Sequence, residues 1–587
     1  MTLATPSRAR PRMPTWVQPT RLSSAVFAAK MMVFQARRVV QDVGAGAPRA
    51  ALTDDPVFTE IVAESRTPLW SDEAMAERAF QLGKVQNLRV AARALHGSTL
   101  AAGQLFSFWR QVGRPSPPRG YATGRMLQQG CMTPAVGGGL CQLSNALYDV
   151  ALQAGCQIVE RHPHSRIVPG SAAAYGRDAT VAWNYVDLRF RSTRALRLTV
   201  RLDRHDLVVR VLGRPEDVAA GPGEGGESST EDAARSCGTC DETDCFLHEH
   251  DDRRPAMATA GHVFLVDEAW PEFQAYVHGA RRDSDRLGLP LDGARWKAER
   301  YAWSNEGFEA AHDAAVEALR RTLALRGAGP QGARRRRAEM DGCERIALSL
   351  ARRLRPRDTA VTVAQSYLPF LWRAGMLGGR EVSVLMTRLP MRMLQDRLDA
   401  AAARRPDQPT LADFRAPRWL VEAEAEALAN AERIITPHAE IAALFGERAH
   451  RLDWAMPPLH AGAPGSRPRR IAFPGPTIAR KGAHLVREAA LALDLEVLLL
   501  GADLEGDGFW DGVRILRPDE GAWTQQVAAV VQPALVEDQP RRLLAALAAG
   551  LPVLATPACG LNHPGVRLVP SDDAQALITA LRDVLRH

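Results

Sequence analysis

Short apolar runs alternate with long helical patterns from about residue 258 to the end of this 587-residue chain. The first round contains the runs HVFLV, AVTVAQSYL, EVSVLM and RIITP, and a second round after Pro457 and Pro458 contains RRIAF, LEVLLLG, VRIL, VAAVV, LPVLATP and VRLVP. Uninterrupted apolar runs between helices are typical of parallel strands that helices cover on both faces. Two successive rounds predict two doubly wound lobes, residues 258–458 and 459–587, with a cleft between them at the strand ends.

The preceding part of the chain predicts a different architecture. Helical spacing covers Glu73 to Leu95, and apolar and polar residues alternate over Val181 to Arg191 and Leu196 to Leu212, as in antiparallel strands with one solvated face. We therefore expect an α+β domain over residues 51–212. Residues 213–236 are rich in Gly, Ser and acidic residues, which predicts a flexible linker. A chain of this length is expected to be multidomain.

The positive charge of the chain lies in residues 1–50, which contain eight Lys and Arg residues and one acid, whereas the whole chain has a net charge of +7. This predicts a basic, partly disordered leader, with one amphipathic patch, AVFAAKMMVFQARRVV, suited to a short docking helix. A weak contact with a membrane surface is the alternative to a solvated leader. No nucleic-acid partner is expected, because the remaining residues have no net charge. The absence of a long apolar window favours a cytoplasmic protein, either free or peripheral at the inner membrane surface.

One stretch, from Gly137 to Asp178, carries a pattern of catalytic residue types. Three glycines precede Cys141 at the start of a helical pattern, where free N–H groups and the helix dipole favour a thiolate and leave donors for an oxyanion. His162 or His164 could be the base, and Asp178 could orient it, which is the logic of a thiol acyl-transfer site. Packing of a buried cysteine, or a metal site made of Cys141, His162 and His164, are the alternatives.

A second group of ligand-type residues follows the linker, in residues 237–257. Cys237, Cys240, Cys245 and His248 lie within twelve residues. Three thiolates and an imidazole are a ligand set for a closed zinc site, and an iron–sulfur cluster is the alternative. An exposed, reduced loop without metal is the other interpretation.

The segments FSFWRQVG, GYATG, GGGLCQLSNALYDVALQAG, IVERHPHS, YGRDATV and DLRF, in this order, resemble the VanW family over about Lys84 to Leu212. The resemblance implies the fold of this family and a cell-envelope context. It does not imply a particular reaction.

The C-terminal part is similar to GT-B glycosyltransferases, through AEALANAERIITPHAEIAALF, RRIAFPGPTIARKGAHLVREAALALDLEVLLLG and PALVEDQPRRLLAALAAGLPVLATPACGL. The resemblance implies two Rossmann-like lobes and a retaining transferase. Lys481 matches the phosphate-binding lysine of the family, and Glu537 matches the first of two glutamates. Pro476 replaces an arginine and Ala545 replaces the second glutamate, and Arg480 is expected to reach the phosphates instead.

We therefore expect a VanW-like protein whose glycosyltransferase module transfers a sugar from a nucleotide-sugar donor to a glycan or lipid-linked acceptor in cell-envelope glycan metabolism. One alternative is a degenerate sugar- or nucleotide-binding module coupled to a Cys-dependent acyl-transferase or hydrolase. Another is a non-catalytic scaffold stabilised by metal.

Overall fold

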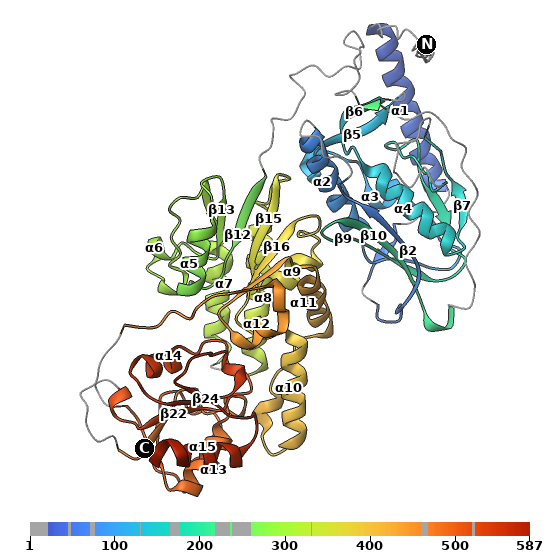
Figure 1. The fold of residues 1–587 in the computed structure, drawn as a ribbon. Coiled ribbons are helices and arrows are strands. Elements are labelled where there is room, and N and C mark those ends of the chain that lie inside the picture. Colours follow the sequence, from blue (N-terminus) through green and yellow to red (C-terminus); the bar gives the residue numbers. More distant parts are fainter. Residues whose placement is uncertain are drawn as a thin grey trace, which may run out of the picture. The chain divides into compact units, whose positions relative to one another are not determined.

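The computed structural model describes residues 21–44, 49–53, 55–70, 77–128, 131–164, 176–217, 235–236, 260–329, 331–458, 468–518 and 523–586. The chain divides into two compact units, Met1–Thr259 and Ala260–His587, and each is described by itself (Figure 1). Among the described residues, no helix is both long enough and apolar enough to cross a bilayer.

The first unit is built on a five-stranded antiparallel sheet with the order β1-β3-β9-β10-β2. In strand β9 inward and outward residues alternate strictly, because one face of the sheet packs on the core. Two three-stranded sheets, β4-β8-β7 and β11-β6-β5, complete the unit. The strands are β1 (Ala51–Leu52), β2 (Glu60–Pro68), β3 (Ser98–Leu100), β4 (Leu105–Ser107), β5 (Thr123–Gln128), β6 (Cys131–Val136), β7 (Gln157–Glu160), β8 (Arg189–Arg191), β9 (Leu196–Leu202), β10 (Asp206–Gly213) and β11 (Arg235–Ser236).

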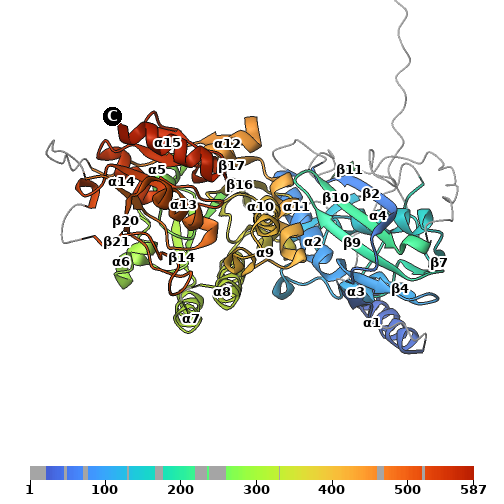
Figure 2. The ribbon, with the colours of Figure 1, turned by 90° about the horizontal axis from the view of Figure 1, so that it is seen from below.

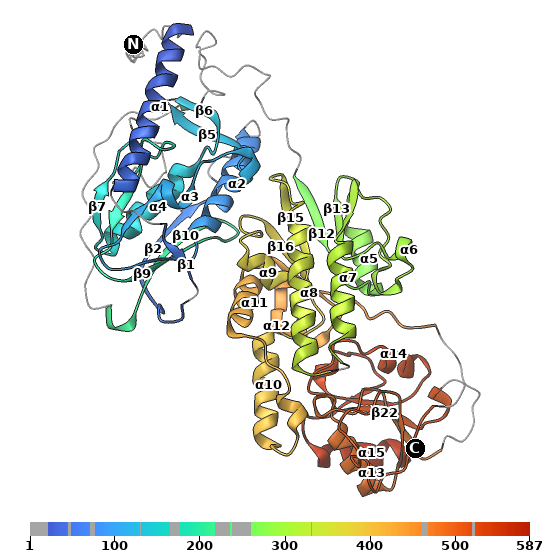
Figure 3. The same ribbon diagram turned by 180° about the vertical axis from the view of Figure 1, so that it is seen from behind.

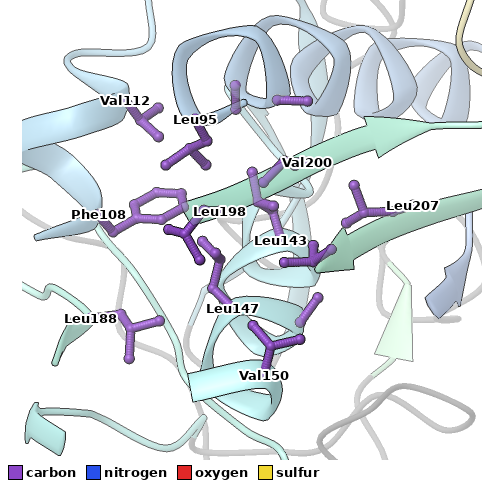
Figure 4. Packing of buried hydrophobic residues seen from close by; sticks show 14 of the residues in the cluster. Leu95, Phe108, Val112, Leu143, Leu147, Val150, Leu188, Leu198, Val200 and Leu207 are labelled. Atoms are coloured by element: carbon purple, nitrogen blue, oxygen red, sulfur yellow. The ribbon is translucent and has the colours of Figure 1, made fainter. Parts of the chain in front are cut away.

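Helices α2 (Arg78–Leu95) and α4 (Leu140–Gln153) pack against this sheet, α2 on β9 and α4 on β2 and β10 (Figure 2). Leu143, Leu147 and Val150 recur at helical spacing on α4 and are fully buried against Leu198 and Leu207 (Figure 4). The helix that carries Cys141 is therefore fixed by the main core of the unit. Helices α1 (Arg21–Gly44) and α3 (Phe108–Val112) complete the described helices of the unit.

The first lobe of the second unit contains a seven-stranded parallel sheet with the order β14-β13-β12-β15-β16-β17-β18. Six of these strands follow the 3-2-1-4-5-6 order of Rossmann sheets, which confirms the predicted doubly wound lobe. The strands are β12 (Gly261–Leu265), β13 (Arg286–Leu289), β14 (Ala310–Asp313), β15 (Asp358–Ala364), β16 (Glu381–Leu385), β17 (Arg433–Thr436) and β18 (Ala449–Arg451). The helices are α5 (Pro271–Ala280), α6 (Gly293–Trp296), α7 (Ala315–Arg326), α8 (Ala333–Ala351), α9 (Leu368–Arg373), α10 (Met391–Arg404), α11 (Arg418–Asn430) and α12 (Ala439–Phe445). Helices α7 and α8 lie side by side (Figure 3).

The second lobe repeats the arrangement with a six-stranded parallel sheet, β21-β20-β19-β22-β23-β24. This is again the 3-2-1-4-5-6 order. Its strands are β19 (Arg470–Phe473), β20 (Glu496–Leu499), β21 (Ile515–Leu516), β22 (Ala529–Gln532), β23 (Val553–Ala555) and β24 (Val566–Leu568), and its helices are α13 (Ala483–Leu493), α14 (Arg541–Ala548) and α15 (Ala574–Arg586).

One of the two stretches expected to form antiparallel strands in the first unit differs from the structure. Within Val181 to Arg191 only Arg189–Arg191 is a strand, because Ala182 and Val186 close a turn in which Asn184 has a φ of 57°. Leu196 to Leu212 forms two antiparallel strands, β9 and β10, which pair with each other. The end of the expected linker also takes part in the fold, since Arg235 and Ser236 pair with Cys131 and Met132.

Candidate functional site

The three glycines before Cys141 form a tight crossing of two backbone segments. Gly137 and Gly139 have φ values of 82° and 92°, which favour glycine. A Cβ atom on Gly138 would lie 2.4 Å from the carbonyl carbon of Gly124, so no side chain fits there. Asn87 on α2 donates to the Gly138 carbonyl at 2.9 Å and fixes the loop. This crossing places Cys141 in the first turn of α4.

The thiol of Cys141 is partly buried in a polar setting. Its Sγ lies 3.8 Å from Thr180 Oγ1 and 3.9 Å from the Val181 carbonyl, and the nearby His164 side chain lowers its pKa. Among the described residues, the backbone N–H groups of Leu140 and Cys141 have no acceptor, as expected in the first turn of a helix. The glycines Gly137 and Gly138, in contrast, use their N–H groups in backbone hydrogen bonds. Donors for an oxyanion are therefore available at the start of α4, and Gly137 and Gly138 do not supply them.

His164 lies between Cys141 and Asp178. Its Nδ1 hydrogen-bonds Asp178 Oδ1, and its backbone N–H donates to Asp178 Oδ2 at 2.6 Å. With Nδ1 bound to Asp178, Nε2 is the imidazole nitrogen left for the thiol, whose charge His164 stabilises. This is the order of nucleophile, base and orienting acid that thiol acyl transfer needs.

Helix α4 also positions Asp178. Asn145 accepts the N–H of Ala179 at 2.8 Å, and the Ser144 hydroxyl donates to the Ala179 carbonyl at 2.5 Å. One helix thus carries the nucleophile and holds the segment that carries the acid. The distance between Cys141 and the Asp178 segment is therefore fixed by Ser144 and Asn145, which follow the cysteine by three and four residues.

The three groups shift one another's pKa values toward charged forms. Burial opposes the effect, but Asp178 and Cys141 together raise the pKa of His164 to about 10. Burial raises the pKa of the Cys141 thiol, yet its hydrogen bond and attraction to His164 outweigh this and bring the net pKa below the usual value. The pKa of Asp178 is lowered against burial by its hydrogen bonds to His164. These shifts favour the charged forms of all three groups, a thiolate beside an imidazolium that a carboxylate orients.

The structure does not bring His162 to this cluster. Its ring lies 3.3 Å from Glu160 and its side chain is 49% exposed, while its backbone carbonyl accepts the N–H of Thr180. Within the described part of the chain, no group of three or more His, Cys, Asp or Glu residues could hold a metal ion, and this covers the metal site considered for Cys141, His162 and His164. The predicted cluster of Cys237, Cys240, Cys245 and His248 lies outside the described residues.

A cavity of about 300 Å³ lies between the two lobes of the second unit. It is lined by residues that follow the carboxyl ends of parallel strands, where ligands of doubly wound sheets bind. Asp267 follows β12, Ser366 follows β15, Arg388 follows β16, Lys481 follows β19 and Asp538 follows β22. The strands β12 and β15, and β19 and β22, are the pairs at which the order of each sheet reverses.

The residues expected to bind a donor lie at or beside this cavity. Lys481 lines it and donates to Glu537 at 3.0 Å. Glu537 is buried behind the lining and also accepts the backbone N–H of Gln539 at 2.9 Å and the side chain of Gln532. Arg480 lines the cavity and donates to Asp413 at 3.1 Å.

The cavity contains charged residues that the sequence analysis missed. Among the described residues, neither Arg388 nor Asp538 has an ion-pair partner, although both line the cavity. Burial opposes ionisation of Asp538, but attraction to Lys481 and Arg388, which line the same cavity, keeps its pKa below the usual value. Asp267 accepts hydrogen bonds from Arg321 at 2.8 Å and from Ser366 at 2.9 Å. The signal that could have found Asp267 and Arg388 is their position one and two residues after the predicted strands HVFLV and EVSVLM.

Comparison with known proteins gives two matches to families. Residues 83–212 match the family described as VanW like protein, and residues 472–587 match the family described as Glycosyl transferases group 1. The chain thus combines a domain that matches VanW-like proteins with a unit of two Rossmann-type lobes, of which the second matches group 1 glycosyl transferases.

Two known proteins are similar to the first unit. The chain is 34% identical over 149 residues to the uncharacterized protein YoaR of Bacillus subtilis, and 31% identical over 156 residues to the vancomycin B-type resistance protein VanW of Enterococcus faecalis. Each match covers 25% of this chain, together with 48% of YoaR and 56% of VanW. The chain therefore spans about half the length of these relatives.

Similar solved structures include sucrose-phosphate synthase from Thermosynechococcus elongatus, at 13% identity and a TM-score of 0.38 over 56% of this chain and 90% of that one. A UDP-forming trehalose-phosphate synthase from Burkholderia xenovorans is 11% identical, with a TM-score of 0.32 over 56% of this chain and 91% of that one.

Proposed function

We propose that the second unit transfers a sugar from a nucleotide-sugar donor to a glycan or lipid-linked acceptor in cell-envelope glycan metabolism. The observation that carries this proposal is the cavity at which the reversal points of two Rossmann sheets meet, in a chain whose second lobe matches group 1 glycosyl transferases. The proposal includes retention of the anomeric configuration, on the likeness of the sequence motifs to retaining enzymes. It also includes a cytoplasmic location, which the free thiols Cys141, Cys156, Cys343 and Cys559 support.

The cations of the cavity would hold the diphosphate of the donor. Lys481 comes from the second lobe and Arg388 from the first, and both lie near Asp538. Pro476 stands where similar sequences have an arginine that supports the diphosphate. We assign this role to Arg388, with Arg480 as a further donor. Glu537 holds the Lys481 ammonium at the edge of the cavity. A leaving diphosphate needs such positioned cations, because its charge grows as the glycosidic bond breaks.

Nucleoside diphosphate binding by the full chain tests this proposal. Calorimetric titration with the diphosphates of uridine, adenosine, guanosine and thymidine should give binding for at least one of them, and the matching nucleotide sugar should release that diphosphate slowly by hydrolysis. If none binds at millimolar concentration, the transferase function is wrong. The anomeric configuration of the released sugar, followed by NMR, tests retention.

A second candidate function is thiol-dependent acyl transfer or hydrolysis in the first unit, which the arrangement of Cys141, His164 and Asp178 favours. In this reaction the Cys141 thiolate attacks the carbonyl carbon of an amide or ester. The N–H groups of Leu140 and Cys141 would receive the oxyanion. His164 then protonates the leaving amine or alcohol, and the thioester passes its acyl group to water or to an acceptor.

Trapping of the acyl-enzyme tests this second function. The full chain is incubated briefly with p-nitrophenyl acetate, quenched in acid and digested, and the acetyl group should lie on the peptide that carries Cys141. The Cys141→Ser variant should lose this adduct. Acetylation spread evenly over several cysteines would contradict the proposal.

We further propose the domain boundaries 1–50, 51–212, 213–236, 237–257, 258–458 and 459–587, with a metal bound in residues 237–257. Three thiolates and one imidazole form the ligand set of a structural zinc site. Metal analysis and the visible spectrum of the purified full chain distinguish zinc, an iron–sulfur cluster and no metal. The Cys240→Ser variant should lose the metal.

A further inference from the structure

Helix α1 is attached to the first unit along one narrow face. The guanidinium of Arg38 binds the Glu160 carboxylate with contacts of 2.6 and 2.5 Å and donates to the Tyr185 carbonyl at 3.1 Å. Asn184 donates to the carbonyl of Gln35 at 3.2 Å. Of the α1 side chains that the structure describes, only those of Gln35 and Arg38 are partly buried. These two residues are three apart and so lie on the same side of the helix.

The rest of α1 presents apolar side chains to solvent. Leu22, Val26, Val33 and Val40 recur with the spacing of one helical face, and Val33 and Val40 are 65% and 71% exposed. Met32 and Val39 widen this face and are also exposed. At about 100° per residue, this apolar face points away from the side that carries Gln35 and Arg38. Figure 2 shows α1 projecting from its unit.

Charge identifies the occupant of this face. Lys30 and Arg37 are exposed beside it, and the first 50 residues contain the whole net positive charge of the chain. An apolar stripe with basic residues at its border binds in the plane of an anionic lipid surface, where the apolar side chains enter the acyl boundary and the cations meet the headgroups. Nucleic acid would use the cations and leave the apolar side chains in water. We propose that α1 docks the first unit on an anionic lipid membrane.

The ion pair of Arg38 and Glu160, which attaches α1 to the unit, lies a few residues from the thiol site in the sequence. Glu160 is the last residue of β7, and His164 lies four positions further along the chain. The docking itself does not depend on either proposed activity, because it uses none of the residues assigned to them.

Co-sedimentation of the full chain with large vesicles tests the proposal. Vesicles that contain phosphatidylglycerol in phosphatidylcholine should bind the protein, and vesicles of phosphatidylcholine alone should bind it at least about tenfold more weakly. The double variant Val33→Asp/Val40→Asp should lose binding by at least about tenfold, since it places two charges on the apolar face. Lys30→Glu/Arg37→Glu should remove the preference for phosphatidylglycerol.

The matched control is Val316→Asp/Leu323→Asp, which changes two exposed apolar residues, 62% and 66% exposed, on helix α7. It should bind vesicles like the wild type. All three double variants change exposed side chains, and unchanged circular dichroism shows that they fold. The proposal is overturned if the wild type does not bind anionic vesicles, or if the α1 variants bind them equally. It is also overturned if α1 instead mediates a dimer, or binding to duplex DNA, without any binding to lipid.

Discussion

The carboxylate of Asp178 contacts His164 at two points, the ring Nδ1 and the backbone N–H, so the imidazole can neither rotate nor shift along the chain without losing a hydrogen bond. This double contact explains why His164 and not His162 is the residue that reaches the thiol. It also couples the charge of Asp178 to the reactivity of Cys141. The Cys141 Sγ lies beside Thr180 and Val181, which are 39 and 40 positions further along the chain and directly follow the segment that carries the acid.

Cys141 is expected to be the most reactive of four free cysteines that the structure describes, Cys141, Cys156, Cys343 and Cys559. Burial raises the pKa of Cys156 to about 11 and those of Cys343 and Cys559 to about 12, while that of Cys141 is lowered. Alkylation by iodoacetamide at pH 7, followed by peptide mass spectrometry, should label Cys141 at least about a hundredfold faster than these three, because the thiolate is the nucleophile. Equal and slow labelling of all four would contradict this.

Asp178→Asn should shift the pH dependence of this alkylation to higher pH. Without the carboxylate the pKa of His164 falls from about 10, the positive charge beside the thiol is lost at neutral pH, and the pKa of Cys141 rises. The alkylation rate at pH 6.5 should fall by about tenfold or more, and the two rates should converge above about pH 10, where both thiols are ionised.

The matched control for this variant is Asp149→Asn. Asp149 lies on α4, the helix that carries Cys141, but it pairs with Arg177 at 3.0 Å and not with His164. Its pH profile should follow that of the wild type. A parallel loss of rate at every pH in Asp178→Asn would instead indicate local unfolding.

Lys481→Ala should weaken nucleoside diphosphate binding by about ten- to a hundredfold, because a charge-assisted contact to phosphate is lost in a partly buried cavity. Arg388→Ala should have an effect of similar size if both cations hold the same diphosphate. Calorimetry on the full chain measures both. Lys297→Ala, which changes an exposed lysine away from the cavity, is the control and should bind normally. Unchanged affinity in both cavity variants would remove these residues from the donor site.

Arg541→Ala should destabilise the second unit by about 2–4 kcal/mol, since it leaves a buried carboxylate without its cation. Arg541 on α14 makes two contacts of 2.6 Å with Glu272 on α5, whose side chain is fully buried, and so connects the two lobes. Urea unfolding followed by tryptophan fluorescence is informative, because Trp270 and Trp454 lie against this guanidinium. The exposed Arg582→Ala is the control, and an unchanged midpoint for Arg541→Ala would contradict the prediction.

The sequence predicts most of the buried strands of the second unit, because strands covered on both faces read as continuous apolar runs. No apolar run in the sequence predicts strands β13, β14 and β18. Strand β13 begins with Arg286, whose charge is neutralised by the buried Asp358 seventy-two residues later, and this pairing leaves no local signal. Strands β14 and β18 are the two edges of the sheet and carry polar residues.

For the thiol site, the sequence identifies the residue types but cannot choose between the two histidines. The choice depends on the course of the chain after β7 and on the hydrogen bonds of Ala179 to Ser144 and Asn145, which join segments more than thirty residues apart. For the cavity, the sequence predicts Lys481 by its resemblance to a motif. Arg388 belongs to no such motif. Its proposed role in diphosphate binding follows from its position in a cavity lined by both lobes.

The crossing of Gly138 over Gly124 has a consequence for how this chain tolerates change. Neither residue has any reactive group, yet a methyl group at either position would meet backbone atoms within 2.6 Å. In a library of all single substitutions scored for labelling of Cys141, these two positions should be as intolerant as the cysteine itself. A map of mutational tolerance would thus mark two residues that do no chemistry as part of the active region.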